Sequence, residues 1–335
     1  EGGTEEQQRT FYSAFYRSVI FPHRFYELDA RQRPVYFSPY DGKVHEGYLY
    51  TDTGYWDTFR ASHPLYNLLF PEISGEIMQG MLNAYDQSGW LPSWSSPGHR
   101  DCMIGNHAFS LFADAWVKGI TNFDAGKAVD AMVHDANMQS PANCRAIGRD
   151  GAEFYKKIGY TPYPEVKEAT AKTLEYAYDD YCAAVLARRI GRDAEADAFA
   201  KTAMNYTNVF DTKTGFVRGR KADGAWCDDF DPTEWGGPFT EGNSWHWTWS
   251  VFQDIPGLIE LMGGVIGVVT RDPRDGVQLV GADHRGVRAG ARRRGRAVPV
   301  AGGSDPSGDL ACAIGGGRAV RVRPGSCCRC GGERG

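Results

Sequence analysis

The sequence predicts a mainly α-helical protein, with paired helices in a toroid or barrel, short β-hairpins in the loops and a disordered tail. Three observations carry this prediction. Apolar residues recur with helical spacing through most of residues 1–264. Segments with strand-like alternation are few and short. The composition changes abruptly near residue 264, which separates a tail at 265–335 from the rest.

The helices are predicted in order along the chain. Apolar residues repeat every four positions over 73–85, and a glycine follows as a stop. Further helices are predicted over 106–118, from about 164 to 190, after the capping residue Asp124, and from Asp193 onward. The short connections between them make neighbouring helices antiparallel, which favours a toroid or barrel of helix pairs.

Strand patterns are confined to three short stretches, PVYFSPY (34–40), EGYLYTDTGYW (46–56) and GFVRGR (215–220). The last follows a turn at 211–215. We expect these stretches to form hairpins or decorated loops between helices. Loops on a rigid scaffold are where functional residues gather.

The tail at 265–335 lacks Phe, Tyr, Trp and Lys, and contains 13 Arg and 16 Gly. Such a segment buries too little apolar surface to offset its conformational entropy, so it is predicted to be disordered. Out-of-frame translation of GC-rich DNA is a second interpretation. A functional basic tail, with ARRRGR at 291–296 as a nucleic-acid patch, is a third.

The whole chain is mildly acidic, with a formal net charge of -5, so nucleic acid is not the expected partner. It has no apolar run long enough for a transmembrane helix. The N-terminus has no basic and apolar regions typical of a signal peptide, and its first residues already look helical.

Three loop segments hold the residues that indicate chemistry, namely 54–65, 89–108 and 236–249. They combine Trp, His, Asn, Asp and Arg, and such mixtures bind sugars through aromatic faces and polar groups. In the third, Glu241 precedes several tryptophans. Indole rings would exclude water from its carboxyl and keep it protonated, as the general acid of a glycosidase requires. Hydrolysis also needs a second carboxylate.

Each of these residues also has a structural interpretation. Trp245 and Trp249 are spaced to form core contacts on one helix face. Glu241 suits the first turn of a helix, where the helix dipole favours an acid. Asp57 fits a loop cap, and His107 with Asn106 fits a helix start or the core.

Long motifs in the same order resemble glycoside hydrolase family 92. They are GYWDTFRASHPL, GWLPSWSSPGHRDCMIGNHA, FDTKTGFVRGR and FTEGNSWHWTW, followed by QDIPGLIELMGG. The family comprises calcium-dependent, inverting exo-α-mannosidases, usually exported to the periplasm or secreted, with a preference for α-1,2 linkages. The resemblance implies that residues 1–264 are part of an (α/α)6 catalytic domain that follows a β-sandwich domain in the family.

The resemblance also implies site residues. Glu241 corresponds to the general acid, while Trp56 and Asp57 correspond to contacts with the terminal mannose of a glycan. The full set of substrate-binding residues expected here is Trp56, Asp57, Arg60, Asn106, His107, Asn243 and Trp245. No metal ligand is assigned, because the family's catalytic base and most calcium ligands belong to motifs that 265–335 does not resemble. We therefore expect a truncated chain with little or no activity.

Two alternatives remain from the residues alone. Another (α/α)-barrel hydrolase would need its second carboxylate within 1–262, at Asp57 or Asp101. A non-catalytic mannose-binding module would bind sugar without hydrolysis and bind polyanions through its basic tail.

Overall fold

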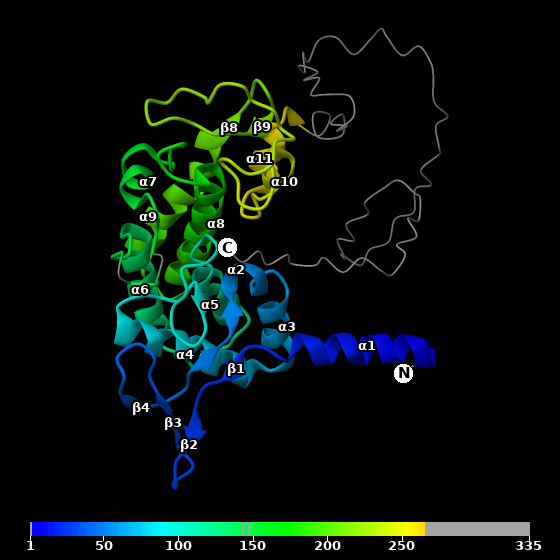
Figure 1. Cartoon of the computed structure of the whole chain (residues 1–335), viewed down its shortest axis with the longest axis vertical. Helices are drawn as coiled ribbons and strands as arrows, with labels where there is room; N and C mark the ends of the chain where they lie inside the picture. Colours follow the sequence, from blue (N-terminus) through cyan, green and yellow to red (C-terminus); the bar gives the residue numbers. More distant parts are fainter. Residues whose placement is uncertain (1, 143, 147, 265–335) are drawn as a thin grey trace, which may run out of the picture. The chain divides into compact units, whose positions relative to one another are not determined.

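Helix α8 (Ala169–Arg189) is the element against which the neighbouring helices pack. The computed structural model describes residues 2–142, 144–146 and 148–264. Figure 1 shows α8 among the neighbouring helices. Most of its 21 residues are buried, and many are alanine, whose small side chain lets other backbones approach closely. It packs against α5 (Ala108–Val117), α6 (Ala125–Asn137), α9 (Asp193–Thr202) and the 3-10 helix η1 (Ala203–Val209).

The predicted helices are confirmed, with one corrected boundary. The segment 73–85 lies in α4 (Pro71–Ser88), which ends at Gly89 with a φ of 81°. Asp124 caps α6 by accepting a hydrogen bond from the Lys127 N–H at 2.9 Å. The start predicted near residue 164 was wrong, because Glu168 has a φ of 55° and helical backbone begins only after it.

The remaining helices are shorter or lie apart from the core. They are α1 (Glu5–Ser18), α2 (Tyr55–Thr58), α3 (Ser62–Leu69), α7 (Ala152–Ile158), α10 (Ser244–Trp247) and α11 (Ile255–Leu261). Helix α1 carries a capping box between Thr4 and Gln7, and none of its residues is buried. It extends away from the other helices in Figure 1. None of the helices in the described ranges has both the length and the apolar character needed to cross a membrane.

The strands are short and antiparallel, as the sequence predicts. Strand β3 (Pro34–Phe37) lies between β2 (Glu27–Leu28) and β4 (Val44–Glu46) in a three-stranded sheet. The other sheets in the described residues have two strands each. These pairs are β1 (His23–Arg24) with β5 (Tyr50–Thr51), β6 (Thr53–Gly54) with β7 (Trp94–Ser95), and β8 (Phe210–Asp211) with β9 (Phe216–Val217). The last pair is the predicted hairpin, closed by a hydrogen bond from Gly215 N–H to Asp211 O at 2.7 Å.

The β6–β7 pair joins the first two sequence motifs. Thr53 lies opposite Ser95, and Gly54 lies opposite Trp94. A β-carbon on Gly54 would lie 1.9 Å from the Trp94 indole nitrogen, so only glycine permits this approach. The start of α2 is therefore fixed against the second motif.

Two apolar clusters make up most of the core. The first joins α4, α5, α6 and α8 through residues such as Met78, Phe109 and Leu186. The second joins α8 to the chain beyond residue 209, and its buried members include Leu174, Phe239 and Trp247. Trp56 packs against this second cluster. The predicted tail at 265–335, with its basic patch, lies outside the described residues.

Candidate functional site

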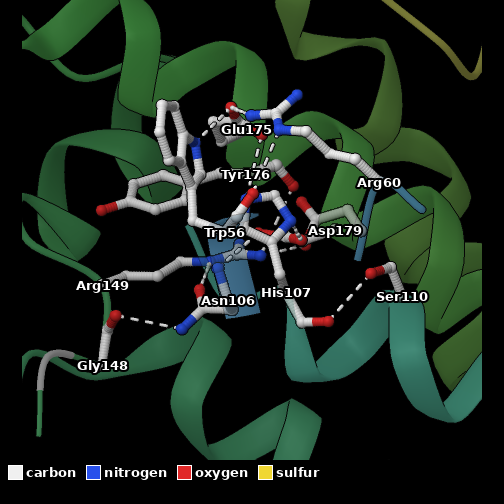
Figure 2. A network of polar contacts seen from close by, with 11 residues as sticks. Trp56, Arg60, Asn106, His107, Ser110, Gly148, Arg149, Glu175, Tyr176 and Asp179 are labelled. Carbon is white, nitrogen blue, oxygen red and sulfur yellow. Dashed lines mark hydrogen bonds and ion pairs between the residues drawn. The ribbon is translucent and has the colours of Figure 1, made fainter. Parts of the chain in front are cut away.

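Glu175 of α8 is a buried carboxylate on which side chains from the first motif converge. Its side chain is 4% exposed. The indole Nε1–H of Trp56 donates to Glu175 Oε1 at 2.9 Å, and Arg60 Nη2 lies 3.9 Å from the same oxygen. The Arg60 guanidinium lies over the Trp56 ring, 4.7 Å from its centroid. Figure 2 shows these side chains directed toward Glu175.

His107 lies between Glu175 and a second carboxylate of the same helix, Asp179. Its Nε2 is 3.1 Å from Glu175 Oε2, and its Nδ1 is 3.2 Å from Asp179 Oδ1. Its ring stacks on Phe59 with centroids 4.2 Å apart. Burial lowers the pKa of His107, but attraction to Asp179 and Glu175 outweighs burial and raises that pKa to about 9. The ring is therefore an imidazolium at neutral pH.

A second buried ion pair extends the network away from the first motif. Asn106 donates its backbone N–H to Asp179 Oδ2 at 2.6 Å and accepts from Arg149 Nε–H at 2.9 Å. Arg149 is also paired with Asp180 at 2.7 Å. Burial raises the pKa of Asp180, while Arg149 acts in the opposite direction. Buried charges of this kind are costly unless they are paired, and Arg149 and Asp180 meet that condition.

The third loop segment, residues 236–249, also contacts α8. The backbone N–H of Ala171, one turn before Glu175, donates to Pro238 O at 3.1 Å. Asn243 is the N-cap of α10, since its Oδ1 accepts from the His246 N–H at 3.3 Å. Trp247 is buried and donates to Thr240 O at 2.9 Å. The loop segments 54–65, 89–108 and 236–249 thus each contact α8, as expected of loops that gather around one site.

Glu241 itself is exposed and has a φ of 44°, in the left-handed region. Its expected shielding by indole is not provided by the described residues. It also lies before α10 and not in the helix's first turn. Trp249 is 44% exposed, so it is not a core residue. Trp245 is half-buried and meets Phe216 edge to face, with centroids 4.7 Å apart.

The other predicted residues divide by exposure. Asp57, Arg60 and Asp101 are exposed, and Trp56 is half-buried. Asn106 and His107 are 4% and 1% exposed, and their side chains belong to the buried network. Their partners Glu175 and Asp179 were missed from sequence. The available sign was a pair of acids four residues apart in an alanine-rich helix, which places both on one face.

A cavity of about 370 Å³ is lined by Phe59 and Arg60. Tyr178 and Phe252 line it as well, with ring centroids 5.5 Å apart. Its volume falls within the roughly 300–1,000 Å³ of small-molecule sites. An aromatic surface with an exposed cation at its edge is suited to a polar ligand that has an apolar face.

The described residues do not fit a calcium ion. In 2–142, 144–146 and 148–264, no group of three or more His, Cys, Asp or Glu side chains is arranged to hold a metal. Calcium takes six to eight oxygen ligands, usually with several carboxylates. Glu175 and Asp179 are occupied by His107, Trp56 and Asn106. Asp114, which lines the cavity, accepts from Asn67 and Lys118.

Helical scaffolds like this one occur in carbohydrate-active hydrolases. Residues 1–271 match the glycosyl hydrolase family 92 catalytic domain. The chain therefore belongs to glycosyl hydrolase family 92, which confirms the resemblance inferred from its motifs.

Solved structures agree with this assignment. An inverting mannosidase of the family from Bacteroides thetaiotaomicron is 57% identical, with a TM-score of 0.78, over 80% of this chain and 36% of that one. A second family α-mannosidase from the same species is 35% identical, with a TM-score of 0.68, over 76% of this chain and 34% of that one. The predicted partial helical barrel is thereby confirmed.

A relative described as a secreted glycosidase of Arthroderma benhamiae is 28% identical over 232 residues. The match covers 64% of this chain and 24% of that protein. The chain thus spans about a third of the Bacteroides enzymes and about a quarter of the Arthroderma protein.

Proposed function

We propose that this chain is part of the catalytic domain of an inverting exo-α-mannosidase that removes terminal α-1,2-linked mannose from glycans. The observation that carries the proposal is the convergence of the family motifs on α8, where Trp56 and Arg60 stack as a wall and Arg60 lines a cavity. The similarity to an inverting mannosidase at 57% identity supports the reaction class. In this proposal the partial catalytic domain comprises residues 1–264.

Glu241 is proposed as the general acid, which protonates the leaving glycosidic oxygen. Trp56, Asp57, Arg60 and Trp245 are proposed to contact the sugar, because each is at least partly exposed. Asn106 and His107 are buried and Asn243 caps a helix. We therefore assign these last three residues to holding the wall in place.

An inverting hydrolase needs a second carboxylate about 6.5–9.5 Å from the acid, with room for a water between them. We place no described carboxylate in that role. The base and the calcium ligands are proposed to lie in the parts of the longer relatives that this chain does not span. The chain as given is then expected to be slow or inactive. By analogy with its secreted relative, we propose an extracytoplasmic location for the intact protein.

Mannose release from α-1,2-mannobiose by the purified chain, with calcium and with a chelator, tests this proposal. The expected rate is at least about 100-fold below that of a full-length family member, the smallest cost of losing a catalytic base. Any residual rate should be higher on α-1,2- than on α-1,3-mannobiose and should fall further in Glu241→Gln. Calcium-dependent release within about tenfold of the full-length enzyme would contradict the proposed absence of the base.

The Asp57→Asn variant tests the alternative that this chain is another (α/α)-barrel hydrolase with Asp57 as its second carboxylate. If Asp57 were the second carboxylate, its replacement and that of Glu241 would abolish substantial activity equally while sugar binding remained. The proposal expects Asp57→Asn to weaken binding instead, since Asp57 is an exposed wall residue.

A further inference from the structure

We infer that Glu175 is a positioning residue, which fixes Trp56 and Arg60 in one orientation from behind the sugar-binding wall. This inference rests on the proposed function for its consequence in binding. Its structural part stands on the contacts of Glu175 alone.

The two carboxylate oxygens of Glu175 have separate partners. Oε1 accepts from Trp56 Nε1–H at 2.9 Å and faces Arg60 Nη2 at 3.9 Å, while Oε2 faces His107 Nε2 at 3.1 Å. The partners come from α2, the residues that follow it and the N-cap of α5. Glu175 therefore holds three parts of the chain in register through one buried group.

Exposure separates the wall from its support. The Glu175 side chain is 4% exposed, whereas the Arg60 side chain is 40% exposed and Trp56 is half-buried. A ligand in the cavity would meet the Arg60 guanidinium, and a ligand on the exposed side of the wall would meet the indole, but neither would meet the buried carboxylate. Glu175 thus acts through Trp56 and Arg60 and does not contact the sugar.

A fixed indole matters to the proposed function because Arg60, which lines the cavity, stacks on the Trp56 ring. Trp56 is held at its nitrogen by Glu175, while Arg60 stacks over its ring and donates from Nε to Trp56 O at 3.1 Å. Side chains ordered before binding lose less conformational entropy when the ligand arrives. Removing the Glu175 charge would free both side chains and weaken binding.

His107 explains how a carboxylate is retained in this position. A buried, unpaired carboxylate is costly, and an opposite charge with well-placed contacts offsets that cost. His107 stands between Glu175 and Asp179, within 3.2 Å of each. The imidazole thus stabilises the charged form of the group that holds Trp56.

The direct test observes the Trp56 indole N–H by nitrogen-15 NMR of the full chain. The chain has 9 Trp, and loss of one resonance in Trp56→Phe assigns it. In Glu175→Gln this resonance should shift more than that of any other tryptophan. Glu76→Gln is the matched control, because Glu76 is a half-buried glutamate that accepts from Tyr50 OH at 2.6 Å on α4. A Trp56 resonance unchanged by Glu175→Gln overturns the inference.

Sugar binding tests the consequence. Glu175→Gln should weaken the affinity for methyl α-D-mannoside about tenfold, the effect of weakening one hydrogen bond to a charged group, while Glu76→Gln leaves it unchanged. Unchanged affinity in Glu175→Gln contradicts the positioning role. If the unaltered chain binds no mannoside, the proposed sugar site fails, and the indole resonance alone decides whether Glu175 positions Trp56.

A variant that fails to fold does not remove the test. Trp56→Phe takes the donor away from the other side of the contact and leaves the buried charges in place. The His107 imidazole resonances should then move, because Glu175 joins the two residues. No movement of these resonances overturns the inference as well.

Discussion

Trp56 and Glu175 are 119 residues apart in sequence, and their side chains are joined by a hydrogen bond of 2.9 Å. This contact connects the short helix α2 with the long buried helix α8. Through His107, Asp179 and Asn106 the contacts continue to the Arg149–Asp180 ion pair. The wall proposed to bind sugar is therefore supported by a chain of buried charges.

Replacing Arg149 with Met should destabilise the chain by about 3–5 kcal/mol, because it leaves Asp180 buried and unpaired. Arg188→Met, on the same helix as Asp180, is the control. Arg188 pairs with Asp193 and Asp197, but all three side chains are about half exposed or more, so at most about 1 kcal/mol is expected. Urea unfolding measures both changes. Equal losses in the two variants would refute the importance of the buried pair.

The His107 imidazole should remain protonated at neutral pH and titrate near pH 9 by NMR. Its pKa is raised above the unfolded value of about 6.5, so its stabilising contribution is complete below pH 6.5. The contribution is lost as the pH rises through about 9, by up to about 1.4 kcal/mol per pH unit. A His107 resonance that titrates at or below pH 6.5 would contradict the double pairing with Glu175 and Asp179.

His63 should make the folded chain less stable as the pH falls below neutral. It is 1% exposed, neither ring nitrogen has a hydrogen-bond partner in the described residues, and burial lowers its pKa to about 3. Below pH 6.5 the unfolded chain therefore gains a proton that the folded chain cannot accept. Between pH 7 and 5 the unaltered chain should lose about 2 kcal/mol relative to His63→Phe. Parallel stability curves for the two proteins in that range would refute this account.

Gly105→Ala should disturb the site through His107. Gly105 has a φ of 82°, and a β-carbon there would lie 2.5 Å from the His107 Nε2. Gly89→Ala is matched, with a φ of 81° and open space around the added carbon, so it carries only backbone strain of about 1–2 kcal/mol. The Gly105 variant should be less stable than the Gly89 variant in urea and should bind mannoside more weakly. Indistinguishable variants would show that His107 can move without consequence.

The sequence was sufficient for features with local causes. The cap at Asp124 and the stop at Gly89 depend on near neighbours and were predicted correctly. The start of α8 was not, because the left-handed Glu168 has no local sequence pattern that requires it. The hairpin at 210–217 was visible from its turn.

The site was predicted only in part, for a similar reason. The motifs identified Trp56, Arg60 and His107, but not the buried helix face that brings them together. Glu175 lies in a segment with no motif, and its role depends on contacts distant in sequence. The exposure of Glu241 likewise depends on tertiary packing, which an adjacent run of tryptophans does not determine.

Titration calorimetry with methyl α-D-mannoside, on the unaltered chain and on Trp56→Ala, decides whether the α2–α8 wall binds sugar. We expect saturable one-to-one binding that is lost in Trp56→Ala, and no binding of methyl α-D-galactoside. The absence of saturable binding to the unaltered chain, or equal binding by Trp56→Ala, would contradict the assignment of the α2–α8 wall as the sugar site.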